Sequence, residues 1–154
     1  MSEEKRTMRI WTASPYSTKT FTDAVEFINK ICVVNNIDII IDIRKNRNAN
    51  GVTMDEEKIT LAAKTRNIKY LYLGDYLGQN AKTFSQETLE TAIKTENGKK
   101  SVSAILKACR KFNVLLLGHT RKYKNDVRYG LAHILKNIIK EKTGETMYIM
   151  HIGS

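Results

Sequence analysis

Proline is almost missing from this sequence, since Pro15 is the only one in 154 residues. Glycine- or serine-rich linkers, internal repeats and low-complexity tracts are missing as well. A chain without them gives no sequence signal for a domain boundary. We therefore expect residues 1–154 to form a single domain, which is long enough to bury one hydrophobic core.

Long apolar runs are also missing. No stretch approaches the roughly 18 apolar residues that a membrane-spanning helix needs, and the N-terminal sequence MSEEKRTMRIW has no apolar segment of the signal-peptide type. The two cysteines, Cys32 and Cys109, form no CxxC pair and fall inside helical patterns. Such cysteines are typical of buried thiols in a reducing compartment. These features predict a cytoplasmic protein without membrane contact, and they leave its oligomeric state open.

Common nucleotide-binding and catalytic motifs are absent. The sequence contains no GxGxxG, no GxxxxGKS or GxxxxGKT, and no GxSxG. No cluster of histidines with acidic residues indicates a metal site. Neither cysteine lies in a loop that is expected to form a site, so nothing supports a cysteine nucleophile. We expect no metal and no cofactor.

Positive charge is what the sequence has in excess. There are 26 lysines and arginines against 16 acidic residues, which gives a formal net charge of +10. Such a surplus favours an anionic partner, either nucleic acid or a phosphate-bearing small molecule. The alternative is a lysine-rich surface that only water and salt contact. Clustering of the cations would distinguish the two.

Apolar strands alternate with amphipathic helices along the chain. Strands are expected at 8–12, 37–43, 69–73, 114–117 and 147–152, and helices at 21–31, 53–66, 85–95, 102–112 and 127–142. This alternation predicts an α/β fold with a mostly parallel central sheet of about five strands flanked by helices, which is a Rossmann-like arrangement.

Several polar residues mark where the helices begin and end. Thr20 or Thr22 is the expected N-cap of the first helix, and Thr53 with Glu56 forms a capping box for the second. Asn97-Gly98 is expected to separate the third helix from the fourth, and Gly144 to end the last one.

Ligands of such sheets bind outside the carboxyl ends of the strands. The segments expected there are 13–19, 42–51, 74–83 and 118–128. In the second of them, Asp42 and Arg44 follow an apolar run and lie two residues apart, so both side chains point to the same face of an extended chain. Asp42 could orient Arg44 for a ligand, or the two could form an internal salt bridge that fixes the loop.

Cations concentrate in two of these segments. The predicted basic rim consists of Arg44, Lys45, Arg47, Arg121, Lys122, Lys124 and Arg128. Arginine suits phosphate because its donors form a fork. Gly118 would let a ligand approach the backbone closely, and Ser14 and Ser17 add hydroxyl groups from the first loop.

Aromatic and titratable residues complete the predicted site. Tyr16, Tyr76 and Tyr123 lie in the same segments and could stack on bases, although each could equally be packing at the surface. His119 follows a buried strand and could act as a general acid or base, as could Asp42. A histidine that only bonds to backbone is the alternative, and His133 and His151 are expected to be structural.

These motifs, in this order, resemble the uncharacterised family known as domain of unknown function 488. The matching segments are Thr12–Ser17, Asp42–Arg44, Asn67–Tyr70 with Leu77-Gly78, Leu116–Gly118, Asp126–Arg128 and His151-Ile152. They span nearly the whole chain. The resemblance implies the same α/β fold and a site at the carboxyl ends of the strands.

The chain departs from that family at its reactive residues. The turn histidine of the family has no counterpart near Ser14, its two late cysteines align with Gly118 and Asp126, and its Cys-His-Arg turn keeps only Arg128. What remains is Asp42, Arg44 and Arg128, the part that would handle an anion. The resemblance therefore implies a member whose catalytic residues are reduced.

Three functions stay open from the sequence. The first is a binder of nucleic acid or of a nucleotide or other phosphate-bearing ligand. The second is an enzyme that acts on a nucleotide or phosphorylated metabolite, with Arg44 and Arg128 as anion clamps. The third is a small basic module that binds or inhibits another protein.

Overall fold

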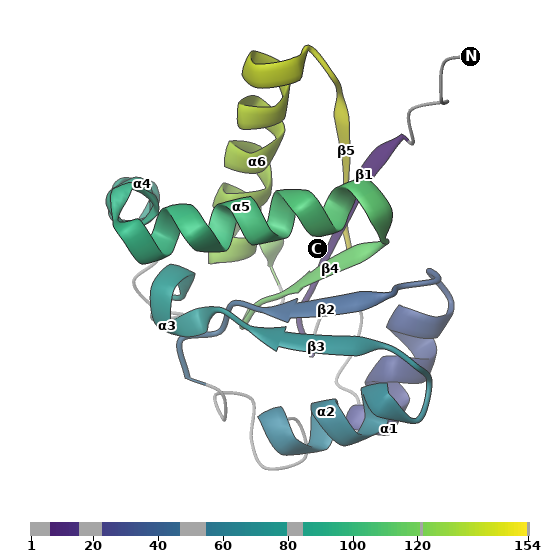
Figure 1. Cartoon of the computed structure of the whole chain (residues 1–154). Helices are drawn as coiled ribbons and strands as arrows, with labels where there is room; N and C mark the ends of the chain where they lie inside the picture. The colour runs from purple at the N-terminus through teal and green to yellow at the C-terminus, as the bar shows by residue number, and fades with distance from the viewer. Residues whose placement is uncertain (1–6, 16–22, 47–54, 80–84, 121, 154) are drawn as a thin grey trace, which may run out of the picture.

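A computed structural model describes residues 7–15, 23–46, 55–79, 85–120 and 122–153 (Figure 1). Its five strands are β1 (Met8–Ala13), β2 (Ile39–Asp42), β3 (Lys69–Tyr72), β4 (Val114–Leu117) and β5 (Met147–His151). They form one sheet in the order β3-β2-β4-β1-β5, and every neighbouring pair is parallel. The predicted α/β, Rossmann-like class with a parallel sheet is confirmed.

Helices cover both faces of this sheet (Figure 1). One face carries α4 (Gln86–Lys94), α5 (Glu96–Lys111) and α6 (Val127–Thr143), and the other carries α1 (Ala24–Phe27), its π-helical continuation η1 (Ile28–Val33) and α2 (Glu56–Lys64). Two short elements, α3 (Gly74–Leu77) and the 3-10 turn η3 (Tyr123–Asn125), follow β3 and β4 in segments that the sequence predicted as loops.

The apolar strands form because both of their faces are covered. All four residues of β4 are buried, and β4 lies between β2 and β1 in the middle of the sheet. Its residues alternate: Val114 and Leu116 join the core under α5 and α6, whereas Leu115 and Leu117 join the core under α1 and α2. A continuous apolar run is the sequence pattern that this two-sided burial requires.

Two predicted helix starts were wrong. The N-cap of α1 is Asp23, whose Oδ1 accepts from Glu26 N at 2.9 Å, and the N-cap of α2 is Asp55, whose Oδ1 accepts from Lys58 N at 2.9 Å. The threonines proposed as caps, Thr20, Thr22 and Thr53, lie outside the described residues. An aspartate side chain accepts hydrogen bonds from the first backbone N–H groups of a helix as well as threonine does. Its negative charge also interacts favourably with the helix dipole.

The prediction that Asn97-Gly98 separates the two helices was wrong, because these residues lie in the first turn of α5. Thr95 caps this helix, and its Oγ1 accepts from Gly98 N at 3.0 Å. A methyl group on Gly98 would collide with the carbonyl oxygen of Ala92 in α4. The glycine is needed because the start of α5 packs directly against the end of α4.

Other predictions from the sequence hold. Gly144 ends α6 in the left-handed conformation, with φ 74°. Cys32 and Cys109 are buried cysteines, and burial raises the pKa of Cys32 to about 12, which keeps this thiol protonated. In the part of the chain that the structure describes, no helix is both long and apolar enough to cross a membrane.

Candidate functional site

The carboxyl ends of β1, β2 and β4 meet at one edge of the sheet, as the sequence predicted. Ile43 N donates to Leu117 O at 3.0 Å and Gly118 N donates to Ala13 O at 2.9 Å, so the ladder continues past the strand ends. The loop after β3 joins them, because a side chain on Gly78 would collide with the backbone of Lys45. We call this region the carboxyl edge.

Asp42 and Arg44 form a buried bidentate ion pair at the carboxyl edge. Arg44 Nε donates to Asp42 Oδ1 at 3.0 Å and Arg44 Nη2 donates to Asp42 Oδ2 at 2.9 Å. Arg44 N and Tyr70 Oη add two further donors to the same carboxylate, at 3.0 and 2.5 Å. Both side chains of the pair are 0% exposed. The internal salt bridge, one of the two interpretations of this motif, is what the structure contains.

This network shifts the ionisation of its members. Burial lowers the pKa of Arg44, but the hydrogen bonds and negative charge of Asp42 outweigh burial and raise it overall. Burial, followed by the charge of Asp42, raises the pKa of Tyr70 far above its usual value. Arg44 is therefore a fixed cation with its own counter-ion, and Tyr70 is a neutral hydrogen-bond donor.

Asp126 and Arg128 repeat the arrangement after β4. Arg128 Nη1 donates to Asp126 Oδ2 at 3.2 Å and to Thr120 O at 2.9 Å, while Arg128 Nη2 donates to Ile152 O at 3.2 Å. These side chains are 1% and 0% exposed. Here burial prevails over pairing: it raises the pKa of Asp126 and lowers that of Arg128. Both predicted anion clamps, Arg44 and Arg128, are thus buried and neutralised by partners within the chain.

Gly118 lies where predicted, at the end of β4, and the reason for a glycine there is close approach. A methyl group would collide with the carboxylate of Asp126. Thr120 N donates to Asp126 Oδ2 at 3.1 Å. The anion that this loop binds in the structure is therefore the side chain of Asp126, six residues after Thr120.

His119 is a buried ring that connects two loops. It is 6% exposed, and its Nε2 accepts from Lys45 N at 3.2 Å. Burial lowers its pKa against the opposing effect of Asp126, so the ring is neutral near pH 7. This geometry supports the backbone-bonding alternative for His119, and Asp42 is likewise occupied by its own donors.

Some of the remaining predicted site residues are exposed to solvent and others are buried. Lys45, Lys122 and Lys124 are exposed at the carboxyl edge, whereas Ser14 is fully buried. Tyr76 is 47% exposed on α3. The predictions for Tyr16, Ser17, Arg47 and Arg121 concern positions outside the described residues.

Four aromatic rings gather at η3 and the elements next to it, a cluster that the sequence did not reveal. We call Tyr123, Tyr129, His133 and His151 the aromatic cluster. Tyr123 stacks on His151 with centroids 4.5 Å apart and an angle of 5° between the planes. The ring centroid of Tyr129 lies 4.5 Å from that of His133 and 5.3 Å from that of His151. Tyr129 and His133 lie four residues apart on α6, so helical spacing brings these two rings together. Tyr123 comes from η3 and His151 from β5, and no local spacing could have predicted that they join the cluster.

His151 is the titratable centre of the aromatic cluster. Its Nδ1 lies 2.6 Å from the hydroxyl oxygen of the buried Thr12. Burial, together with the nearby His133 and Arg128, lowers the pKa of His151 to about 4. The pKa of His133 is lowered as well, by burial and by Lys136.

Acid should therefore destabilise the fold through His151. Between its usual pKa of 6.5 and its folded pKa of about 4, the unfolded chain binds the extra proton, so the stabilising contribution is complete above 6.5 and is lost as the pH falls toward 4. His119 and His133 act in the same sense, and Asp126, whose pKa is raised, acts in the opposite sense. We expect urea unfolding to show lower stability at pH 4.5 than at pH 7.5.

The variant His151→Asn isolates this contribution, because the amide can still bond Thr12 but does not titrate. It should reduce the difference in stability between the two pH values, and His133→Gln should reduce it less. An equal pH dependence in wild type and His151→Asn would contradict the assignment.

Comparison of the chain with family models, curated proteins and solved structures gave no match. The resemblance to domain of unknown function 488 therefore rests on the short motifs alone, and the function has to be argued from the residues at the carboxyl edge.

Proposed function

We propose that the chain binds nucleic acid along the carboxyl edge, with exposed lysines on the phosphates and Tyr123 stacked on a base. The observation that carries this proposal is the arrangement around η3. Lys122 and Lys124, the residues directly before and after Tyr123 in the chain, are both exposed. The ring of Tyr123 is held in place by its stack on His151. An ordered aromatic ring next to exposed cations is the combination that binds single strands with little sequence preference.

Lys45 extends the same surface. Its backbone amide bonds to His119, in the loop that leads to Lys122, and its side chain is exposed. The formal charge of +10 supports attraction of a polyanion over a distance. Arg44 and Arg128 are buried and already paired with carboxylates, so they do not form a pocket for a single phosphate. This favours an extended surface that contacts several phosphates of a polymer.

The test is the salt dependence of binding. We expect a labelled single-stranded oligonucleotide to bind in fluorescence anisotropy, with log affinity falling linearly with log salt. Each phosphate contact contributes about 0.7 to the slope for single strands and about 0.9 for duplex. Lys122→Ala with Lys124→Ala should therefore flatten the slope by roughly 1 to 2 units, at all sequences alike.

Three controls sharpen this test. Lys111→Ala with Lys140→Ala removes two exposed cations near the opposite edge of the sheet and should leave affinity and slope almost unchanged. Tyr123→Leu should weaken single-strand binding without changing the slope, because stacking releases no counterions. Inorganic phosphate and a mononucleotide should compete poorly. The proposal would be rejected if no binding were measurable at low salt, or if the two lysine double variants had the same slope of log affinity against log salt.

The resemblance to domain of unknown function 488 is compatible with this function and remains a proposal itself. One contact supports it: Gly118 and Asp126, which align with the two late cysteines of the family, touch each other here. Residues that are adjacent in space can be exchanged together. The chain then has an ion pair between Asp126 and Arg128 in place of the thiols of the family.

A further inference from the structure

We infer that the groove between α5 and α6 is a second binding surface, for an acidic amphipathic helix of a partner protein. The groove has a volume of about 450 Å³ and is lined by described residues of α4, α5 and α6. None of its lining residues belongs to the carboxyl edge, so this inference is independent of nucleic-acid binding.

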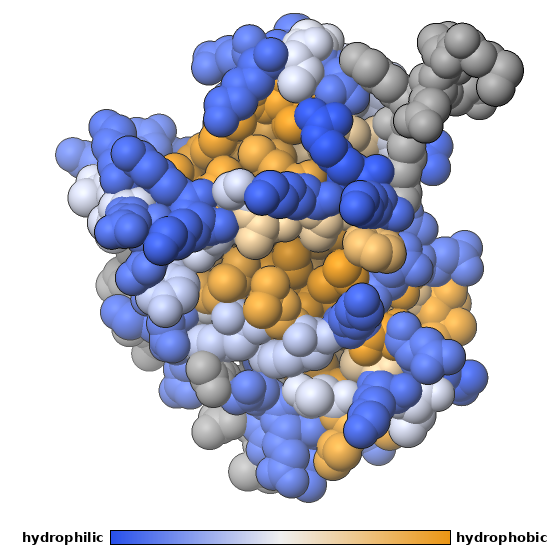
Figure 2. Space-filling view, viewed as in Figure 1, coloured by the Kyte–Doolittle hydropathy of each residue, from blue (hydrophilic) through white to orange (hydrophobic). Residues whose placement is uncertain are grey.

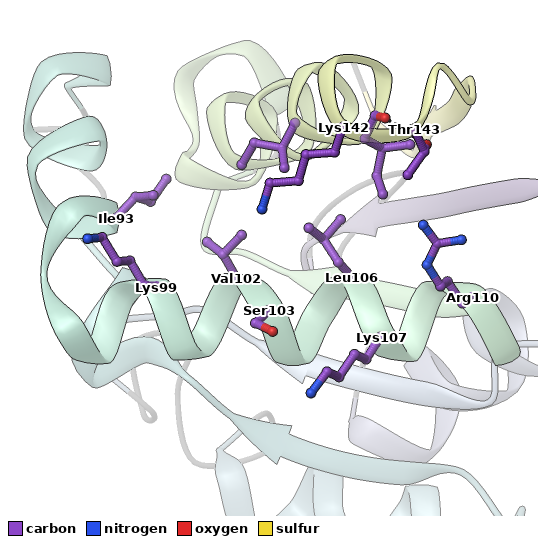
Figure 3. A pocket seen from close by; sticks show the side chains of 11 residues that line it. Ile93, Lys99, Val102, Ser103, Leu106, Lys107, Arg110, Lys142 and Thr143 are labelled. Atoms are coloured by element: carbon purple, nitrogen blue, oxygen red, sulfur yellow. Dashed lines mark hydrogen bonds between the residues drawn. The ribbon is translucent and has the colours of Figure 1, made fainter.

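The floor of the groove is apolar. Val102 and Leu106 point from α5 toward α6 (Figure 3), and Ile93, Ile138 and Ile139 complete the floor. Leu106, Ile93 and Ile138 are only partly buried, so a partner could cover them further. Figure 2 shows this apolar surface between α4, α5 and α6, framed by hydrophilic side chains.

The charges along the groove have one sign. Lys99, Lys107, Arg110 and Lys142 line it, and no Asp or Glu is among its described lining residues. Arg110 has a partner just outside, Glu145 Oε1 at 3.1 Å. Lys142 reaches from α6 toward α5, while Lys99 and Arg110 lie at the two ends of the groove (Figure 3). A partner therefore needs apolar residues along its centre and carboxylates on its flanks.

The length and walls of the groove favour a helix. From Lys99 to Arg110 the axis of α5 advances roughly 16 Å, or about three helical turns. Two helices side by side offer ridges and grooves into which a third helix can pack. An amphipathic helix that inserts residues at i, i+3 or i+4 and i+7 is a recurring way to fill such a groove.

Other occupants fit less well. The described lining contains no aromatic ring, so bases would find no stacking surface. A second copy of this chain would bring its own excess of positive charge, with lysine facing lysine in a symmetric contact. An alkyl anion needs a cation at one end only, whereas the cations here follow the whole length.

The test uses a designed peptide as the probe. It is a helix of about 16 residues with leucines on one face and glutamates beside them, labelled with fluorescein and titrated with the full chain. We expect saturable binding, and we expect a peptide with serine in place of leucine to bind at least tenfold more weakly. Lys99→Glu with Lys142→Glu should weaken binding of the leucine peptide about tenfold, since two attractions become repulsions.

A matched variant controls for net charge. Lys111→Glu with Lys140→Glu makes the same charge change on the same two helices outside the groove, and it should change affinity less than threefold. Hydrogen exchange should slow in α5 and α6 when the peptide binds. The inference would be overturned if the serine peptide bound as tightly as the leucine peptide, or if the two double variants had equal effects. It would also be overturned if the groove bound only dodecanoate, an oligonucleotide or phosphatidylglycerol vesicles.

Discussion

Replacing Asp42 by alanine is expected to lower the free energy of unfolding by about 3–5 kcal/mol. The carboxylate accepts four hydrogen bonds, two of them from the guanidinium group of Arg44 and one from Tyr70. Without it, a cation that is 0% exposed stays inside the protein with no counter-charge from this position. The same substitution would remove the acceptor of Arg44 N, which fixes the start of the loop after β2.

Urea denaturation of four chains would measure this effect: wild type, Asp42→Ala, Arg44→Ala and the double variant. The double variant should be less destabilised than the sum of the two single variants, because once both partners are gone no buried charge remains. Additive losses would show that the pair does not act as a unit.

Asp38 provides a control next to the same strand. It lies just before β2, is exposed, and its Oδ2 accepts from Asn113 N at 2.8 Å. Asp38→Ala should reduce stability by only about 1 kcal/mol, the usual net contribution of one hydrogen bond. Equal losses at Asp38 and Asp42 would show that burial of the charge is not the cause.

The strands of this fold were easier to predict from the sequence than the starts of its helices. A run such as Ile39–Asp42 has to be buried on both faces, so the strand and its parallel neighbours follow from the pattern. The same pattern, together with the rule for strand ends, correctly brought Asp42 and the loop at Gly118 to one edge. Helix starts were less predictable, because Asp23 and Asp55 compete with nearby threonines and only the folded backbone decides which side chain reaches an amide.

The sequence predicted that the strand ends carrying the candidate site residues lie side by side, but not which partners their side chains bond. Sequence spacing gives the side of a strand on which Arg44 lies, but not whether its partner is a ligand or Asp42. Likewise, Asp126 and Arg128 repeat the Asp-x-Arg spacing, and that repetition was the available signal for a second internal pair. The contact between His151 and Tyr123 had no such signal, since it depends on the packing of η3 against β5.

Replacing Asp126 by alanine is the other change with a large expected effect, about 3 kcal/mol. It removes the counter-charge of the buried Arg128 and the acceptor of Thr120 N. We place the loss at the lower end of the range because Arg128 keeps its bonds to the carbonyl groups of Thr120 and Ile152. Asp126→Asn should be milder, since the amide oxygen can still accept from Thr120 N. Urea denaturation measures both variants.

Gly118 gives this prediction a sharper form. In the wild-type background, Gly118→Ala should destabilise by roughly 1–3 kcal/mol, because the new methyl group collides with the carboxylate of Asp126. In the Asp126→Ala background that carboxylate is gone and the methyl group has room, so the same substitution should have a much smaller effect. The two changes should therefore be less than additive by about 1 kcal/mol or more. Strict additivity would mean that Gly118 is required for its backbone alone, and that the loop after β4 is not built around the carboxylate of Asp126.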